Sequence, residues 1–158
     1  MNKALNEALS VEIAQKIKSK ANQTFDNAYK AVLATENAKY VQGFLVMATQ
    51  PDQPIEHSWI EVSETSLNEP TVSIIDPNFP HLHTTPAQLW YFPAQTVSVK
   101  KLKAIIEESK EDYPEDHPLP IYGEAPYEYY GDVMLGGKEY LAAFQAAEAK
   151  CQEIRISQ

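Results

Sequence analysis

The sequence predicts an α+β fold, and three observations lead to that prediction. Apolar residues recur at helical spacing in residues 1–35. Runs rich in β-branched and aromatic residues follow between residues 39 and 76. Helical spacing then returns near residue 99 and again after residue 138. Strands that follow one another and are flanked by helices indicate a short antiparallel sheet packed against helices.

The N-terminal region predicts two helices separated by the polar stretch 18–23. The first covers residues 11–17, with Ser10 as its N-cap. The second has Thr24 at its N-terminal edge. Its buried face, at helical spacing throughout, consists of Phe25, Ala28, Tyr29, Val32 and Leu33.

Three strands are expected at residues 39–48, 55–62 and 71–76. Gly43 lies in the middle of the first strand and marks either a bulge or a close approach of another backbone. The polar stretch 63–70 is expected to be the loop between the second and third strands. Short links between consecutive strands predict an antiparallel meander.

The remainder of the chain predicts two more helices and a long loop. Residues 77–93 look irregular, with a cluster of aromatic residues at 89–92 as core or cover. A third helix follows from the apolar spacing after Val99. The segment 113–131 holds four prolines and five tyrosines, and we expect it to cover a surface or a cleft. The last helix, 138–153, turns Tyr140, Leu141 and Phe144 inward.

Composition describes an acidic chain of one domain, residues 1–158, with a net charge of −9 and a pI of about 4.9. This charge disfavours nucleic acid and anionic membrane surfaces as partners. No apolar stretch approaches the length of a membrane span, and no secretory signal is visible. One cysteine, Cys151, fits a reducing compartment, so we expect a cytoplasmic protein. The sequence implies no cofactor.

One predicted cross-strand pair, His57 and Asp76, suggests a general base with an orienting carboxylate. If the loop 63–70 closes a hairpin, Val62 faces Thr71 and His57 faces Asp76. Alternation places His57, Trp59 and Glu61 on the face of the sheet that also carries Asp76. A carboxylate beside a histidine fixes its tautomer and stabilises its cation, as a general base requires. The alternative interpretation is that His57 and Asp76 are surface residues at strand ends without a catalytic role.

Four short motifs between residues 22 and 80 carry a family resemblance. They are TFDNA (24–28), YVQGF (40–44), PIEHSW (54–59) and IDP (75–77). Together they resemble a group of uncharacterised proteins with a papain-like or transglutaminase-like thiol hydrolase fold. The pattern of that group is Cys-aromatic-x-Asn-Ala, Tyr-Val-x-Gly-aromatic, Pro-Ile-x-His-Ala/Ser-Trp and Val/Ile-Asp-Pro.

The resemblance implies a catalytic triad in which a cysteine at a helix N-terminus is joined by His57 and Asp76. Asn27 and Trp59 match the pattern as orienting and packing neighbours. The cysteine position, however, is occupied by Thr24. Two roles are open to Thr24: a helix N-cap, which threonine fills well, or a nucleophile. Known threonine nucleophiles use their own α-amine as base, which an internal threonine lacks.

Three further groups of residues are candidates for function. His81 and His83 could chelate a metal ion from one strand face, but the prolines around them indicate a loop and no third ligand has a suitable spacing. Cys151 is expected to be a buried structural residue of the last helix. Tyr127 and Tyr129, in the Tyr/Pro-rich segment, could contact a ligand or simply pack over the core.

These observations lead to three hypotheses about function. The first is a catalytically degenerate thiol hydrolase-like protein that binds a small molecule, peptide or protein in the inherited cleft. The second is an active amidohydrolase or acyltransferase that uses Thr24 or a water molecule activated by His57. The third is a protein-interaction module whose surface is the tyrosine-rich segment.

Overall fold

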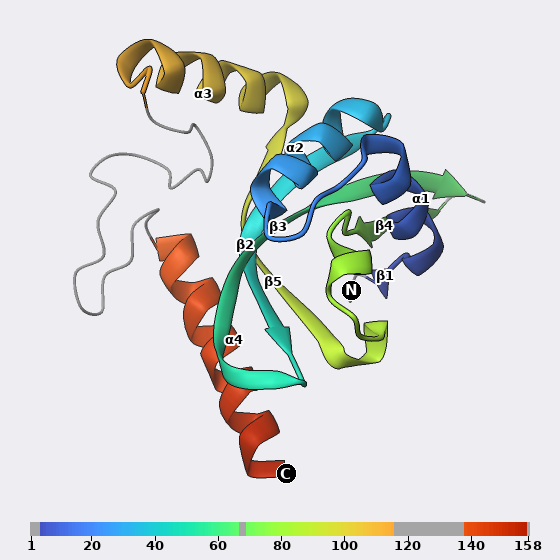
Figure 1. Cartoon of the computed structure of the whole chain (residues 1–158), viewed down its shortest axis with the longest axis vertical. Coiled ribbons are helices and arrows are strands. Elements are labelled where there is room, and N and C mark those ends of the chain that lie inside the picture. The colour runs from blue at the N-terminus through green and yellow to red at the C-terminus, as the bar shows by residue number, and fades with distance from the viewer. Residues whose placement is uncertain (1–3, 67–68, 116–137, 158) are drawn as a thin grey trace. The chain divides into compact units, whose positions relative to one another are not determined.

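The computed structural model describes residues 4–66, 69–115 and 138–157 (Figure 1). Its strands are β1 (Ala4–Leu5), β2 (Ala38–Met47), β3 (Gln50–Ser66), β4 (Glu69–Ile75) and β5 (Leu89–Ser98). Its α-helices are α1 (Glu7–Ile17), α2 (Thr24–Ala34), α3 (Val99–Asp112) and α4 (Lys138–Ser157), and short 3₁₀ turns lie at Phe79–His81 and Pro86–Gln88. The predicted α+β class is therefore confirmed.

The five strands form one mixed sheet in the order β1-β4-β3-β2-β5. β1 pairs with β4 in parallel, whereas β3 and β4 are antiparallel. The three predicted strands are neighbours, in the order β4-β3-β2, but the predicted short antiparallel sheet is in fact mixed, because β1 adds a parallel strand. The two-residue strand β1 was too short to leave a periodic signal in the sequence.

The chain divides into two compact units. The first contains residues 4–41, 58–83 and 96–115, and the second contains residues 42–57, 84–95 and 138–157. The first unit holds α1, α2, α3, β1 and β4, and the second holds α4. That residues 1–158 behave as one domain stays a prediction.

The start of α1 differs from the prediction. The N-cap is Asn6, whose side-chain Oδ1 accepts a hydrogen bond of 3.0 Å from the backbone N–H of Leu9. Ser10 is instead a fully buried residue inside the helix, and its hydroxyl donates to the carbonyl of Asn6 at 2.7 Å. Serine suits both positions, so sequence alone placed the helix start too late.

The hairpin of β3 and β4 has a different register from the predicted one. Val62 pairs with Ser73, not with Thr71, and the ladder runs from Ile60↔Ile75 to Ser66↔Glu69. The stretch 63–70, predicted as a loop, is therefore mostly strand. The proposed pairing of His57 with Asp76 was wrong by two positions. Because a shift of two preserves the alternation, Glu61 still shares a face with Ile74, its observed partner.

The aromatic cluster at residues 89–92 begins strand β5, which the sequence reading missed. Pro86 and Pro93 made the region look irregular. β5 lies at the edge of the sheet, where every second backbone N–H points away from the neighbouring strand. A proline is tolerated at such an edge, which explains how Pro93 sits inside a strand.

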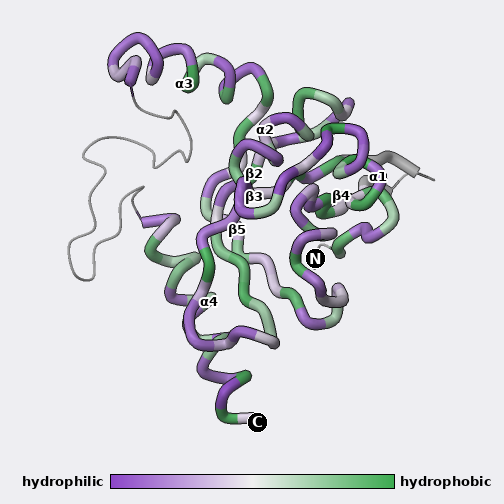
Figure 2. Tube along the Cα trace, in the orientation of Figure 1, coloured by the Kyte–Doolittle hydropathy of each residue, from purple (hydrophilic) through white to green (hydrophobic). Residues whose placement is uncertain are grey.

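The second unit is built on a hydrophobic cluster between its strands and α4. Figure 2 shows hydrophobic segments alternating with hydrophilic ones along α4. The buried members of the cluster are Phe44, Val46, Tyr140, Ala143, Ala147 and Cys151. The rings of Phe44 and Phe144 meet edge to face with centroids 5.4 Å apart. The inward face of α4 thus includes Tyr140 as predicted, whereas Leu141 is only half-buried.

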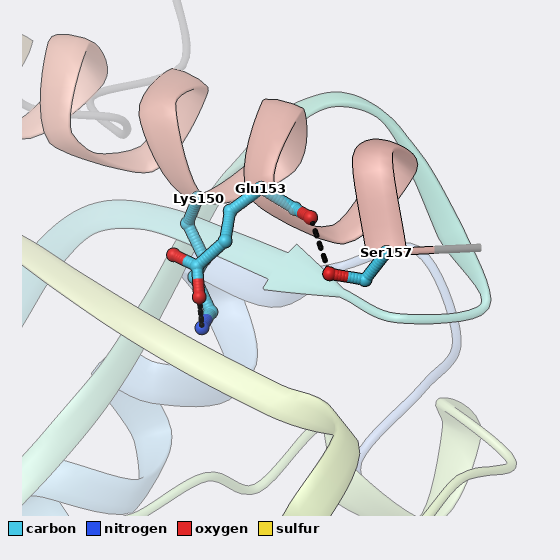
Figure 3. Close-up of polar contacts among 3 residues, drawn as sticks. All are labelled: Lys150, Glu153 and Ser157. Atoms are coloured by element: carbon cyan, nitrogen blue, oxygen red, sulfur yellow. Dashed lines mark hydrogen bonds and ion pairs between the residues drawn. The ribbon is translucent and has the colours of Figure 1, made fainter.

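Polar contacts complete the C-terminal turns of α4. The ammonium of Lys150 lies 3.2 Å from the carboxylate of Glu153 (Figure 3). It also lies 4.6 Å from the ring centroid of Trp90. The Ser157 hydroxyl donates to the Glu153 carbonyl at 2.9 Å. One guanidinium nitrogen of Arg155 donates to the carbonyls of Pro51 and Asp52, which ties α4 to β3 within this unit.

Two other predictions concern the C-terminal half. The predicted third helix is confirmed as α3, with Leu102 and Ile106 buried. The expected covering segment 113–131 falls almost entirely outside the described residues. In the parts of the chain that the structure does describe, none of the helices is both long enough and apolar enough to span a bilayer.

Gly43 is the close-approach point that the sequence suggested. A Cβ atom built on Gly43 would lie 2.2 Å from the carbonyl oxygen of Phe92 and 2.9 Å from the amide nitrogen of Ala94, both on β5. Both atoms belong to the backbone, so a side chain here would have to push β5 away from β2.

We therefore expect Gly43→Ala to lower the free energy of unfolding by about 1–3 kcal/mol, because the methyl group overpacks the β2–β5 contact. Urea denaturation measures this loss. Thr49→Ala, in the exposed turn before β3, is the control and should change the free energy by less than about 0.5 kcal/mol. Equal stability of Gly43→Ala and the native protein would contradict the close contact.

Candidate functional site

The centre of the candidate site is the side-chain amide of Asn78, which is 5% exposed. Its Nδ2 donates to Oδ1 of Asp76 at 2.8 Å, to Oγ1 of Thr24 at 3.1 Å and to the carbonyl of Ser58 at 3.1 Å. The amide has two N–H groups, so at least one of these bonds is shared. Asn78 thereby joins α2, β3 and the end of β4 in the first unit.

The orientation of this amide follows from a chain of hydrogen bonds that begins at the backbone. The N–H of Lys20 donates to Oδ1 of Asn27 at 3.1 Å, which identifies the oxygen of that amide. Nδ2 of Asn27 then donates to the carbonyl of Lys20 and to Oδ1 of Asn78, both at 2.7 Å. Nδ2 of Asn78 must therefore point toward Thr24 and Asp76.

Asp76 is fully buried, directly after strand β4. Its Oδ1 accepts hydrogen bonds from both the backbone N–H and the side chain of Asn78, each at 2.8 Å. Its own backbone N–H donates to the Ser10 hydroxyl at 3.0 Å. Pro77 follows it, and the N–H of Phe79 closes the turn on the Asp76 carbonyl at 3.0 Å. A buried carboxylate needs donors of this kind to compensate for its lost hydration.

Thr24 is the first residue of α2, and the N-cap is Gln23. The prediction that Thr24 caps its own helix was therefore wrong. Its Oγ1 accepts from the N–H of Ser58 at 3.0 Å and from Asn78, and it donates to the Ser58 carbonyl at 3.2 Å. These bonds use the hydroxyl group both as a donor and as an acceptor. These bonds attach the threonine to β3.

Two of the predicted triad positions share a neighbour. Thr24 and Asp76 are linked through Asn78 in the first unit. His57 belongs to the second unit, where it is 4% exposed and its ring centroid lies 6.3 Å from that of Tyr91. A triad of all three residues stays a prediction.

The other predicted binding residues fall in different places. Asn27, at 1% exposure, is the orienting amide described above, and Trp59 is fully buried in β3. Both therefore lie inside the protein rather than on its surface. Tyr127 and Tyr129 lie outside the described residues.

The possible histidine metal site does not form. His81 hydrogen-bonds through Nε2 to the hydroxyl of Ser19 at 3.0 Å. His83 is exposed and adopts a positive φ of 54°, so the two residues do not follow the strand geometry that would place them on one face. Among the described residues no group of three histidine, cysteine or carboxylate side chains could hold a metal ion.

Cys151 is a buried structural residue, as expected, at 0% exposure in the cluster beneath α4. Burial raises the pKa of its thiol above the ordinary value, and this effect exceeds the opposing influence of Arg155. A thiol of this kind is a poor nucleophile at neutral pH.

Sequence reasoning missed the residues that connect the site: Asn78, Ser58 and Ser10. Asn78 directly follows the IDP motif, and an asparagine after Asp-Pro indicates a turn. It does not indicate a residue that is hydrogen-bonded to several elements. Ser58 contributes to the site through its backbone N–H and carbonyl, and a sequence does not reveal contacts made by the backbone. Its hydroxyl also donates to the Val41 carbonyl at 2.6 Å. For Ser10, the sequence predicts only the role of a helix cap.

We expect Asn78→Ala to lower the free energy of unfolding by about 3 kcal/mol, because it leaves buried groups of Asn27 and Asp76 with fewer partners. Asn78→Asp keeps the size of the side chain and removes the donor, so it should be destabilising as well. Gln53→Ala, at an exposed position of β3, serves as the control. Denaturation at neutral pH that finds Asn78→Asp as stable as the native protein would contradict the assigned amide orientation.

Comparison with protein-family models, with curated proteins and with solved structures finds no match to this chain.

Proposed function

We propose that this protein is a non-catalytic relative of the papain-like or transglutaminase-like thiol hydrolases, which binds a small molecule, peptide or protein and cleaves nothing. The observation that carries the proposal is the state of Thr24. This residue occupies the nucleophile position of the resemblance, and its hydroxyl is hydrogen-bonded to the backbone of Ser58 and to Asn78.

A nucleophile needs a lone pair that can reach the substrate and a base that can take its proton. The Thr24 hydroxyl donates to the Ser58 carbonyl at 3.2 Å and accepts hydrogen bonds from the Ser58 N–H and from Asn78, so it is engaged by groups of the protein itself. These bonds support a structural role in which Thr24 attaches the start of α2 to β3.

The chemistry of threonine points the same way. Its hydroxyl has a far higher pKa than a thiol, and a helix N-terminus offers at most about 2 kcal/mol toward ionisation. Asp76 also supports the proposal, because its Oδ1 accepts two hydrogen bonds from Asn78, as a structural carboxylate does. The proposed function thus keeps the polar framework of a hydrolase and gives up the reaction.

The acidic charge of −9 limits the partner to molecules other than nucleic acids and anionic membranes. A cytoplasmic location is part of the proposal and accords with the single thiol.

Acyl-transfer probes test whether activity remains. A broad fluorophosphonate or acyl-phosphate probe should leave the folded native protein unlabelled, as judged by intact-protein mass spectrometry. Labelling that disappears in His57→Ala but persists in Thr49→Ala would overturn the proposal and favour an active amidohydrolase or acyltransferase.

Restoring the thiol tests the inherited site. Thr24→Cys should react with iodoacetamide faster than free cysteine at neutral pH, because the new thiol lies at a helix N-terminus within the polar framework. The native protein gives the background, since Cys151 is buried. Glu7→Cys is the matched control, at the first residue of α1 and without that framework. If Thr24→Cys reacts no faster than Glu7→Cys, the thiol hydrolase ancestry is wrong.

A further inference from the structure

Helix α3 carries its charges in the order that its own dipole disfavours. Lysines 100, 101 and 103 crowd the N-terminal half, although the N-terminus of a helix favours negative charge. The C-terminal half, where positive charge is favoured, holds Glu107, Glu108, Glu111 and Asp112 against the single Lys110. The Ser98 cap, which accepts from the N–H of Lys101 at 3.2 Å, supports the helix in spite of these charges.

These charges lie on the exposed side of α3. Leu102 and Ile106, which are 0% and 4% exposed, define the side packed into the first unit. The opposite side follows helical spacing through Lys100, Ala104, Glu107 and Glu111, all exposed. Figure 2 shows most of α3 in the hydrophilic colour. None of the lysines and acids on this outer face is ion-paired with another residue in the described part of the chain.

We propose that the outer face of α3 pairs with the same face of a second copy of this chain, with the two helices antiparallel. Lys100 and Glu108 are each four residues from Ala104, so a two-fold axis beside Ala104 sets Lys100 of each copy opposite Glu108 of the other. Lys101 and Glu107 are related in the same way. The methyl side chain of Ala104 allows the helix axes to approach at the centre.

Charge complementarity selects a second copy over other occupants. The N-terminal half of α3 is basic and its C-terminal half is acidic, so two copies of this helix have complementary charges only when they are antiparallel. A two-fold axis between the copies gives this antiparallel arrangement. The pairing also places the acids of each copy beside the N-terminal half of the other helix, where its dipole favours them. The net charge of −9 on each chain opposes association, so the dimer is weak and forms at high protein concentration.

Sedimentation velocity on the whole chain tests this pairing. The native protein should shift from monomer toward dimer as its concentration rises to about 1 mM, the range of a weak complex. Two triple variants should each stay monomeric: Lys100→Glu with Lys101→Glu and Lys103→Glu, and Glu107→Lys with Glu108→Lys and Glu111→Lys. Both variants place favourable charges along the helix dipole, so α3 should fold in each, which circular dichroism checks.

Mixing the two triple variants in equal amounts should restore a dimer that forms at lower concentration than that of the native protein, because one α3 is then acidic and the other basic. A control variant carries Lys20→Glu, Lys30→Glu and Lys39→Glu, at exposed positions outside α3. Its net charge equals that of the acidic triple variant at residues 100, 101 and 103. It should not form the mixed dimer with the basic variant. A native protein that is monomeric at about 1 mM, a mixture that stays monomeric, or a control that pairs equally well would each overturn the proposal.

Discussion

The first unit depends on one requirement, which is that a fully buried carboxylate must be supplied with hydrogen-bond donors. Asp76 has no exposed surface, and Asn78 supplies it with two N–H groups. Asn78 can do so only because Asn27 holds the other side of its amide, and Asn27 is in turn held by the backbone of Lys20. The loop before α2, the helix itself and the turn after β4 are thus fixed by one series of polar contacts.

This arrangement explains why a threonine can stand at the start of α2. Its hydroxyl offers one donor and two acceptors, and the backbone of Ser58 and the amide of Asn78 provide matching groups. A cysteine there would make weaker hydrogen bonds and hold the helix less firmly. At this position the chain therefore has a residue that attaches the helix firmly to β3.

The sequence predicted the elements with strong periodicity and missed those fixed by long-range contacts. Helices α2 and α3 were found because their apolar residues repeat over several turns. Strand β5 was missed because Pro93 is allowed only by an edge position that the sequence does not reveal. Among the site residues, Thr24, Asn27 and Asp76 were found through short motifs. Asn78 was not, because its importance comes from partners far away in the chain.

Cys151 gives the second unit a reporter that requires no engineering. The thiol is enclosed by the cluster that joins α4 to β2, and it is the one cysteine in the sequence. A reagent can reach it only when α4 lifts away or the unit unfolds, so the rate of modification under native conditions measures how often that opening occurs. Chemical modification of one thiol can therefore report local opening of the second unit, while amide hydrogen exchange reports opening of the first unit.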